Sequence, residues 1–314
     1  LKDHYRPYVQ GEALALRAML HFDLLRIYGP IYSEETAGTI CMPYQETTSK
    51  EIQPMLSASE VIEKVIRDLK DAAELLKDDR IRTEGVMNGA SEDPNENTDF
   101  RYRQFRMNYY AVQGLLARAY LWKGDKENAY ACATAVIKEN EEKEVFAWTP
   151  KASVQGNNPD LIFSTEVMFA LYNQSRVNNY DALFNPSASI SSILTFAGES
   201  MAEGVESSKI NYVYPDMDDL RRTEMWSVET VTEYNSETGE EKEHNMLCFS
   251  KFKNLTTSET RRYMIPLLRL SEMYLIAAEC TDNLDEALGY VNAIRSHRNC
   301  VNLPAFTTED EKMA

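Results

Sequence analysis

Aromatic side chains that could bind sugars gather in the middle of the chain. Flat aromatic rings stack on the C–H faces of sugar rings, and neighbouring amides and carboxylates can bond the sugar hydroxyls. The stretches 178–181 and 211–216 combine tyrosine with asparagine and aspartate in this way. The alternative for each ring is packing beneath a loop, which would leave it buried. We predict a carbohydrate site whose stacking platforms are Tyr180, Tyr212, Tyr214 and Trp226.

Signatures of catalysis are missing from the sequence. The four histidines lie in separate segments, and none belongs to an HExxH pattern. The chain has no GxSxG elbow, no GxxxxGK[ST] phosphate loop and no GxGxxG dinucleotide loop. Among 50 acidic residues some carboxylate pair will lie at a glycosidase separation by chance, so such pairs carry little weight. We predict that the protein is not an enzyme.

One short stretch resembles a calcium loop. From Asp93 to Asp99, oxygen-bearing side chains occupy alternate positions. A calcium loop also needs Gly at the sixth position and Glu at the twelfth, where this chain has Thr98 and Gln104. The five cysteines are scattered and form no CxxC pair. We therefore expect a solvated turn at this stretch, no metal and no cofactor.

Composition narrows the class of protein and of partner. The net charge of −17 gives no general attraction to phosphate backbones, so nucleic acid is not an expected partner. The 43% hydrophobic content is enough for a sizeable core, and the low counts of Gly (12) and Pro (11) favour helices. No apolar run approaches the roughly 18 residues of a membrane-spanning helix.

The chain opens with an apolar stripe at helical spacing. From Val9 to Ile27, apolar residues recur every three or four positions. This period predicts one continuous helix, ended by Gly29, with Leu16, Leu20 and Leu24 buried.

A second helix is predicted over residues 58–76. Ser57 and Glu60 form a capping box ahead of it, and its apolar residues also repeat every three or four positions. The two helices can therefore pack antiparallel as one hairpin.

A third helical pattern resembles a tetratricopeptide repeat. After a polar stretch at 79–106, which we expect on the surface, residues 108–138 place small and aromatic residues at the spacing of that repeat. Gly124 and Asp125 supply the turn and the N-cap of the return helix.

The helical period fails between 145 and 263. Short β-rich runs alternate there with polar loops, and 235–240 resembles a hairpin loop. Helix is expected to return at Pro266, with another helix near Leu284–Ile294. The predicted fold is mainly α: tetratricopeptide-like helical hairpins with a large irregular insertion of loops and short strands, where binding groups are often found.

Charged residues on these helices are expected to be structural. Glu12 with Arg17, Asp23 with Arg26, and Arg269 with Glu272 lie at spacings that allow pairing along one helix. Exposed pairs of this kind contribute only about 0.2 to 0.5 kcal/mol.

Two separated motifs resemble those of the SusD/RagB family. In Gly11–Ile31, Glu12 and the pairs Arg17-Ala18 and Tyr28-Gly29, with Phe22-Asp23-Leu24 between them, are similar to the family's signature helix. Pro266–Cys280, followed by Asn292 and Arg295, is similar to its later repeat helix. Leu115–Ile137 is similar to its middle repeat, though any tetratricopeptide protein could supply that match.

The resemblance implies a cell-surface lipoprotein of the outer membrane that binds oligosaccharide without catalysis and delivers it to a SusC-like TonB-dependent transporter. It implies one SusD-like domain over 1–314, with hairpins in 1–144, a ligand-binding segment in 145–263 and a last hairpin in 264–314. We expect truncation at both ends, because no lipoprotein cysteine lies near Leu1 and the family's C-terminal motif does not follow Thr308. Contact with the membrane is expected only through a lipid anchor on the missing N-terminal part. From the residues alone, a peptide-binding tetratricopeptide adaptor is the alternative, although the insertions break its period of about 34 residues.

Overall fold

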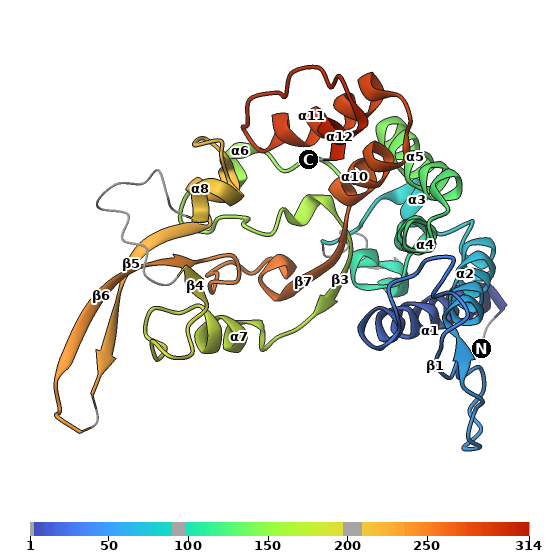
Figure 1. Cartoon of the computed structure of the whole chain (residues 1–314), viewed down its shortest axis with the longest axis horizontal. Helices are drawn as coiled ribbons and strands as arrows, with labels where there is room; N and C mark the ends of the chain where they lie inside the picture. The colour runs from blue at the N-terminus through green and yellow to red at the C-terminus, as the bar shows by residue number, and fades with distance from the viewer. Residues whose placement is uncertain (1–2, 90–97, 197–208, 236, 314) are drawn as a thin grey trace.

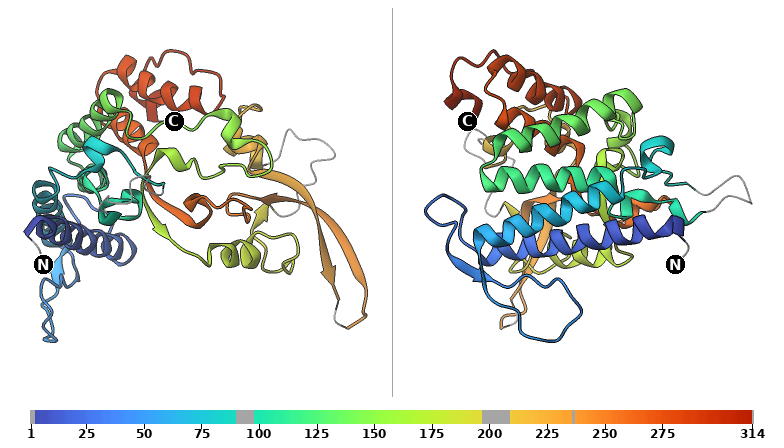
Figure 2. Two further views of the ribbon diagram at one scale, coloured as in Figure 1. Left: turned by 180° about the vertical axis from the view of Figure 1, so that it is seen from behind. Right: turned by 90° about the vertical axis from the view of Figure 1, so that its right-hand side faces the viewer.

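The main helices form a stack in which each one packs on the next. The computed structural model describes residues 3–89, 98–196, 209–235 and 237–313. In the order α1, α2, α4, α5, α10, α11, each helix contacts its successor, and in the side view they lie in layers with α1 at one end (Figure 2). The helices of the stack are α1 (Arg6–Tyr28), α2 (Ala58–Leu75), α4 (Tyr109–Lys123), α5 (Lys126–Lys143), α10 (Leu270–Cys280) and α11 (Leu284–His297).

Local signals begin and end these helices as the sequence predicts. The Ser57 hydroxyl accepts a hydrogen bond from the backbone N–H of Glu60 at 3.3 Å, and the Glu60 carboxylate accepts one from the N–H of Ser57 at 2.8 Å. Gly124 ends α4 at a φ of 83°, a backbone conformation that glycine adopts without strain. Asp125 then caps α5 by accepting from the N–H of Asn128 at 3.1 Å.

The stretch from 145 to 263 lies beside the stack as short helices, loops and strands (Figure 1). β3 (Val167–Tyr172) pairs antiparallel with β7 (Met264–Arg269), the strand that leads directly into α10. β5 (Trp226–Tyr234) and β6 (Glu241–Phe249) form a long antiparallel hairpin that projects from the body, and β4 (Thr195–Phe196) pairs with β6. Shorter elements complete the described chain, among them β1 (Ile40–Met42), β2 (Leu56–Ser57), α3 (Ile81–Glu84), α6 (Lys151–Val154), α7 (Arg176–Leu183), α8 (Lys209–Val213), α9 (Leu220–Thr223), α12 (Glu309–Met313) and the 3-10 turns η2 (Thr98–Phe100) and η3 (Arg103–Phe105).

The mainly α fold is confirmed, with one difference in where a predicted helix begins. The hairpin loop expected at 235–240 does connect β5 to β6. The helix expected from Pro266 is wrong at its start, because Pro266 lies in β7 and α10 begins at Leu270. Since β7 pairs with β3, backbone hydrogen bonding to a distant strand overrides the apolar helical period over these residues.

The core lies between the stacked helices and reaches under β3 and β7. The α2 stripe is buried as predicted, at Ala58, Ile62, Val65, Leu69, Ala72 and Leu76. Gly114 lets α4 approach β7, because a Cβ there would lie 2.5 Å from a Leu268 methyl carbon. Through this contact α4 packs directly on β7, the strand that leads from the insertion into α10.

α1 is one continuous helix, but the face expected to be buried is exposed. Leu20 is 58% exposed, and Leu16 and Leu24 are also exposed. The opposite face is buried instead, through Gly11, Ala15, Ala18, Phe22 and Leu25. α1 thus carries two apolar stripes, and the one with the smaller residues meets α2 because small side chains allow close helix packing.

Several charged signature residues pair with residues on other elements rather than along their own helices. Arg17 on α1 pairs with Asp68 on α2 at 2.6 Å, and Glu272 on α10 pairs with Arg118 on α4 at 2.6 Å. Of the pairs expected along one helix, Asp23 with Arg26 is present at 3.6 Å. The other two expected pairs are wrong, because Glu12 pairs with Arg103, Arg17 with Asp68 and Glu272 with Arg118 on neighbouring elements.

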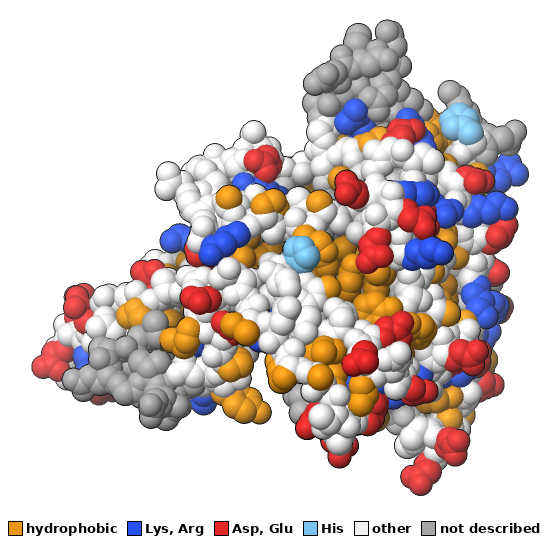
Figure 3. All heavy atoms as spheres, turned by 90° about the horizontal axis from the view of Figure 1, so that it is seen from above, with side chains coloured by type: hydrophobic (Ala, Val, Ile, Leu, Met, Phe, Trp, Pro, Cys, Tyr) orange, Lys and Arg blue, Asp and Glu red, His pale blue; other side chains and the backbone are white. Residues whose placement is uncertain are grey.

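Figure 3 shows the face viewed from above, where hydrophobic side chains gather in the middle and charged side chains of both signs surround them.

Within the described ranges, no helix is both long enough and apolar enough to cross a membrane.

Candidate functional site

Two adjoining pockets lie where the helical stack meets the insertion. The larger, about 600 Å³, is here called the aromatic pocket. It is lined by Thr98, Asp99, Arg101, Tyr102, Phe105, Arg106, Tyr172 and Thr260. The smaller, about 370 Å³, is here called the inner pocket. Thr260 lines both, and η3 contributes Gln104 to one and Phe105 to the other.

Three rings from two distant segments form the aromatic pocket. Tyr172, at the end of β3, is 47% exposed, and Tyr102 is 37% exposed. The half-buried Phe105 ring meets Tyr172 edge-on, with centroids 5.4 Å apart, and Tyr263 supports Tyr172 from another side at 5.2 Å. Supported but accessible rings of this kind suit the flat faces of sugars.

Tyr102 has a backbone conformation that is uncommon for a tyrosine. Its φ is 58° and its ψ is 41°, in the left-handed region. Such a residue is kept there only where its surroundings hold it, and such positions cluster at ligand sites.

A buried arginine holds this part of the chain in place. Arg103 is 2% exposed, and its guanidinium donates to Asp79 at 2.6 and 3.0 Å and to Glu12 on α1 at 2.5 Å. Asn108 donates to the carbonyls of Arg103 and Met168, at 3.0 and 2.8 Å, and so ties η3 to β3. The expectation that 79–106 is only a surface stretch is therefore wrong for these residues.

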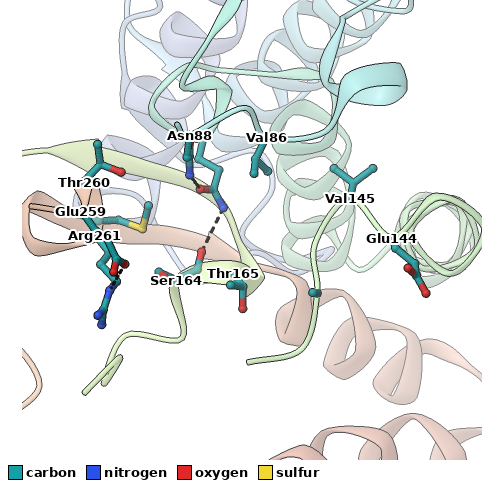
Figure 4. Close-up of a pocket in the computed structure, with 12 residues that line it drawn as sticks. Val86, Asn88, Glu144, Val145, Ser164, Thr165, Glu259, Thr260 and Arg261 are labelled. Carbon is teal, nitrogen blue, oxygen red and sulfur yellow. Dashed lines mark hydrogen bonds and ion pairs between the residues drawn. The ribbon is translucent and has the colours of Figure 1, made fainter. Parts of the chain in front are cut away.

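The inner pocket combines apolar side chains with a small group of hydrogen-bonded polar ones (Figure 4). Gln104, almost fully buried, donates to the carbonyls of Ser164 and Val167 at 3.1 and 2.6 Å and accepts a hydrogen bond from the Asn88 amide. Asn88 Oδ1 and Arg261 Nη1 are buried without a hydrogen-bond partner among the described residues. These two atoms could receive a donor and an acceptor of a ligand.

Three arginines lie near one another beside the inner pocket, which Arg261 lines: Arg176, Arg261 and Arg262. Burial, together with the nearby charges of Arg262 and Arg261, lowers the pKa of the Arg176 guanidinium to about 10. Arg262 lies over the Tyr263 ring, 4.9 Å from its centroid. Arg261 is paired with Glu259 at 2.6 Å, and Asp160 acts on Arg176 in the opposite sense, so the positive charge of this group is partly neutralised.

The four aromatic residues proposed from the sequence do not form one exposed cluster. Tyr180 on α7 is 6% exposed, so it cannot serve as a stacking platform in this structure. Trp226 is half-buried against Phe249, with centroids 4.7 Å apart. Tyr212 on α8 is 90% exposed, and Tyr214 follows that helix.

Sequence reasoning missed four residues of the aromatic pocket: Arg101, Tyr102, Phe105 and Arg106. They fall in 79–106, which lacks a helical period and was assigned to the surface. The sequence did contain a signal. Residues 100–105 alternate three aromatic side chains with two arginines and a glutamine, in a stretch with no helical period that would call for aromatic residues in a core.

Metal binding finds no support in the described part of the chain, where no group of three or more His, Cys, Asp or Glu side chains could hold an ion. The calcium-like stretch is outside that part for residues 93–97.

Sequence comparison identifies the family. The profile described as the SusD family matches residues 82–314, and a second, described as starch-binding associating with outer membrane, matches residues 2–88. The chain belongs to the SusD family. The family expectation is thereby confirmed, and the tetratricopeptide adaptor is not favoured. No curated protein matches the chain in sequence.

Solved structures share the fold at low sequence identity. A SusD-like carbohydrate binding protein from Bacteroides vulgatus has a TM-score of 0.68 and 19% identity, and covers 100% of this chain and 59% of its own. A SusD superfamily protein from Bacteroides thetaiotaomicron has a TM-score of 0.63 and 24% identity, over 95% of this chain and 60% of its own. Surface glycan-binding protein A from Bacteroides uniformis has a TM-score of 0.62 and 14% identity, over 100% of this chain and 64% of its own. This SusD-family chain thus spans less than two thirds of the length of these proteins.

Proposed function

We propose that this SusD-family protein binds an oligosaccharide at the surface of the outer membrane, without catalysis, and delivers it to a TonB-dependent transporter. Two proteins of the same fold are described as carbohydrate-binding or glycan-binding, and the profile matching 2–88 is described as associating with the outer membrane. We also propose that residues 1–314 act as one domain, since the pockets join the stack to the insertion.

The aromatic pocket is the observation that carries the binding proposal. Its exposed rings supply stacking surfaces, and Asp99 and Thr98 supply an acceptor and a hydroxyl for sugar hydroxyls. A volume of about 600 Å³ lies in the range of ligand pockets, which is roughly 300 to 1,000 Å³.

Replacement of one supported ring tests this site. Tyr172→Ala should weaken glycan binding in calorimetry by about 0.5 to 1.5 kcal/mol, the usual contribution of an aromatic contact. Tyr234→Ala is the matched control, because Tyr234 is 64% exposed on the projecting hairpin, outside the pocket. Thermal melts should show both variants folded. Equal binding by wild type, Tyr172→Ala and Tyr102→Ala would show that sugars bind elsewhere.

The segment predicted from the sequence remains a second location, with Trp226, Tyr212 and Tyr214 as its rings. Trp226→Ala separates the two locations. If glycan binding is lost with the melting temperature retained, the sugar binds at Trp226 rather than in the aromatic pocket. If the protein unfolds, Trp226 belongs to the core.

Transporter delivery is tested by co-purification. Detergent extracts of outer membranes should yield the protein together with a TonB-dependent barrel when the protein is captured by a tag. Capture of the protein alone, under conditions that preserve other outer-membrane complexes, would contradict the delivery step.

A further inference from the structure

Arg106 is a poorly neutralised cation in the aromatic pocket. Its side chain is 56% exposed, and its ion-pair contact within the described residues is Glu12, at 4.0 Å. The other carboxylate oxygen of Glu12 is 2.5 Å from Arg103, which is buried and needs that charge. The guanidinium of Arg106 therefore has N–H groups beside the aromatic rings that can still donate hydrogen bonds to a ligand.

The charges around Arg106 favour an anion at this place. Arg101 also lines the pocket and donates to the carbonyl of Gly89 at 2.7 Å, and within the described part of the chain the acidic side chain of the lining is Asp99. Arg262 lies behind Tyr172, over the Tyr263 ring. A local excess of arginine on a chain of net charge −17 is not a general property of the surface.

We propose that the aromatic pocket selects acidic sugars, whose carboxylate or sulfate is bound by Arg106 while the sugar ring stacks on Tyr172 or Tyr102. A planar guanidinium can donate two parallel hydrogen bonds to a carboxylate or a sulfate, which fixes the group in orientation as well as in position. The neighbouring rings exclude water from one side of the pair and so strengthen it. This inference rests on the proposed glycan binding and adds the chemical class of the glycan.

Matched acidic and neutral glycans test the class by calorimetry. The pairs are oligogalacturonate with its carboxyl-reduced form, sialyllactose with lactose, and a chondroitin sulfate oligosaccharide with its desulfated form. At least one acidic member should bind about tenfold or more tightly than its neutral partner, the equivalent of one charge-assisted contact. The pairs also separate carboxylate from sulfate, and the preference should shrink as salt is raised.

Variants of Arg106 place the preference in the pocket. Arg106→Gln should reduce the acidic preference to about twofold or less, because it should weaken binding of the acidic member more than binding of its neutral partner. Arg106→Lys should keep part of the preference, because the charge remains but the planar fork is lost. Arg26→Gln is the matched control, since Arg26 is 47% exposed, has a weak ion pair at 3.6 Å and lies outside the pocket. Thermal melts confirm folding of each variant.

The outcomes distinguish the two proposals. Equal binding of acidic and neutral partners, or a preference that Arg106→Gln and Arg106→Lys both leave intact, overturns the acidic-sugar inference while glycan binding stands. If no acidic or neutral glycan binds the wild-type protein, the proposed function itself fails.

Discussion

Helices α1 and α2 pack against each other, yet their apolar residues are arranged differently. In α2 these residues form one stripe, and that stripe is buried. In α1 they form two stripes on opposite faces; the small-residue stripe meets α2, and the stripe with Leu16, Leu20 and Leu24 is exposed. Periodicity therefore identifies a buried face only where a helix has a single apolar face. Contiguous exposed apolar surface often marks an interaction site.

The largest expected effect is at the buried stripe of α1. Phe22 is 1% exposed and meets Trp122 edge-on, with centroids 5.9 Å apart. Phe22→Ala should reduce the free energy of unfolding by about 3 to 5 kcal/mol, because it leaves a cavity in the helical core. Urea denaturation measures this, and a loss below about 1 kcal/mol would mean that α1 does not pack on the stack through this face.

The ion pair between the two helices should contribute less. Burial raises the pKa of the Asp68 carboxyl, but hydrogen bonds from Arg17, Arg67 and Tyr44 outweigh burial and hold that pKa below its usual value. Asp68→Asn should cost about 1.5 to 3 kcal/mol at neutral pH, since hydrogen bonds to a buried charge are weakened.

The same carboxylate gives a pH dependence. Because its pKa is lower in the folded than in the unfolded protein, its stabilisation is present above about pH 4 and is lost as pH falls through the folded pKa. The wild type should therefore lose more stability than Asp68→Asn between neutral pH and this acidic range. Parallel stability curves for the two proteins would contradict the pairing.

At Gly11, α1 lies close to Leu76, the residue that caps the end of α2. A Cβ there would lie 2.7 Å from Leu76 Cγ. Gly11→Ala should destabilise the protein by about 1 to 3 kcal/mol through overpacking, although alanine is the better helix former. Ala13→Gly on the exposed face is a control that changes helix propensity without this contact, and stabilisation by Gly11→Ala would show that Leu76 moves aside freely.

The smallest expected effect is at the exposed stripe. Leu20→Ala should change the free energy of unfolding by no more than about 0.5 kcal/mol, because Leu20 is 58% exposed. The measured loss should rise toward 2 to 5 kcal/mol only if another surface covers this face, since the side chain would then be buried. Leu116→Ala, with Leu116 4% exposed on α4, should cost about 2 to 5 kcal/mol and serves as the buried reference.

Features decided by neighbours in the chain could be predicted from the sequence by itself. Ser57 with Glu60 and Gly124 with Asp125 set helix ends through hydrogen bonds or backbone conformations a few residues apart, and the period of α2 determines its buried face. The family could be predicted as well, because its motifs are contiguous stretches of sequence.

The tertiary structure alone decided which α1 stripe is buried, which partners the charged signature residues take, and where the candidate site lies. Arg103 meets Glu12 across 91 positions, and Phe105 meets Tyr172 across a helical hairpin, α4 with α5. A spacing pattern carries no information about such contacts, because they depend on how the helices and β3 pack against one another in space. Tyr180 shows the reverse case, in which composition indicated an exposed ring and packing beside the sheet buried it.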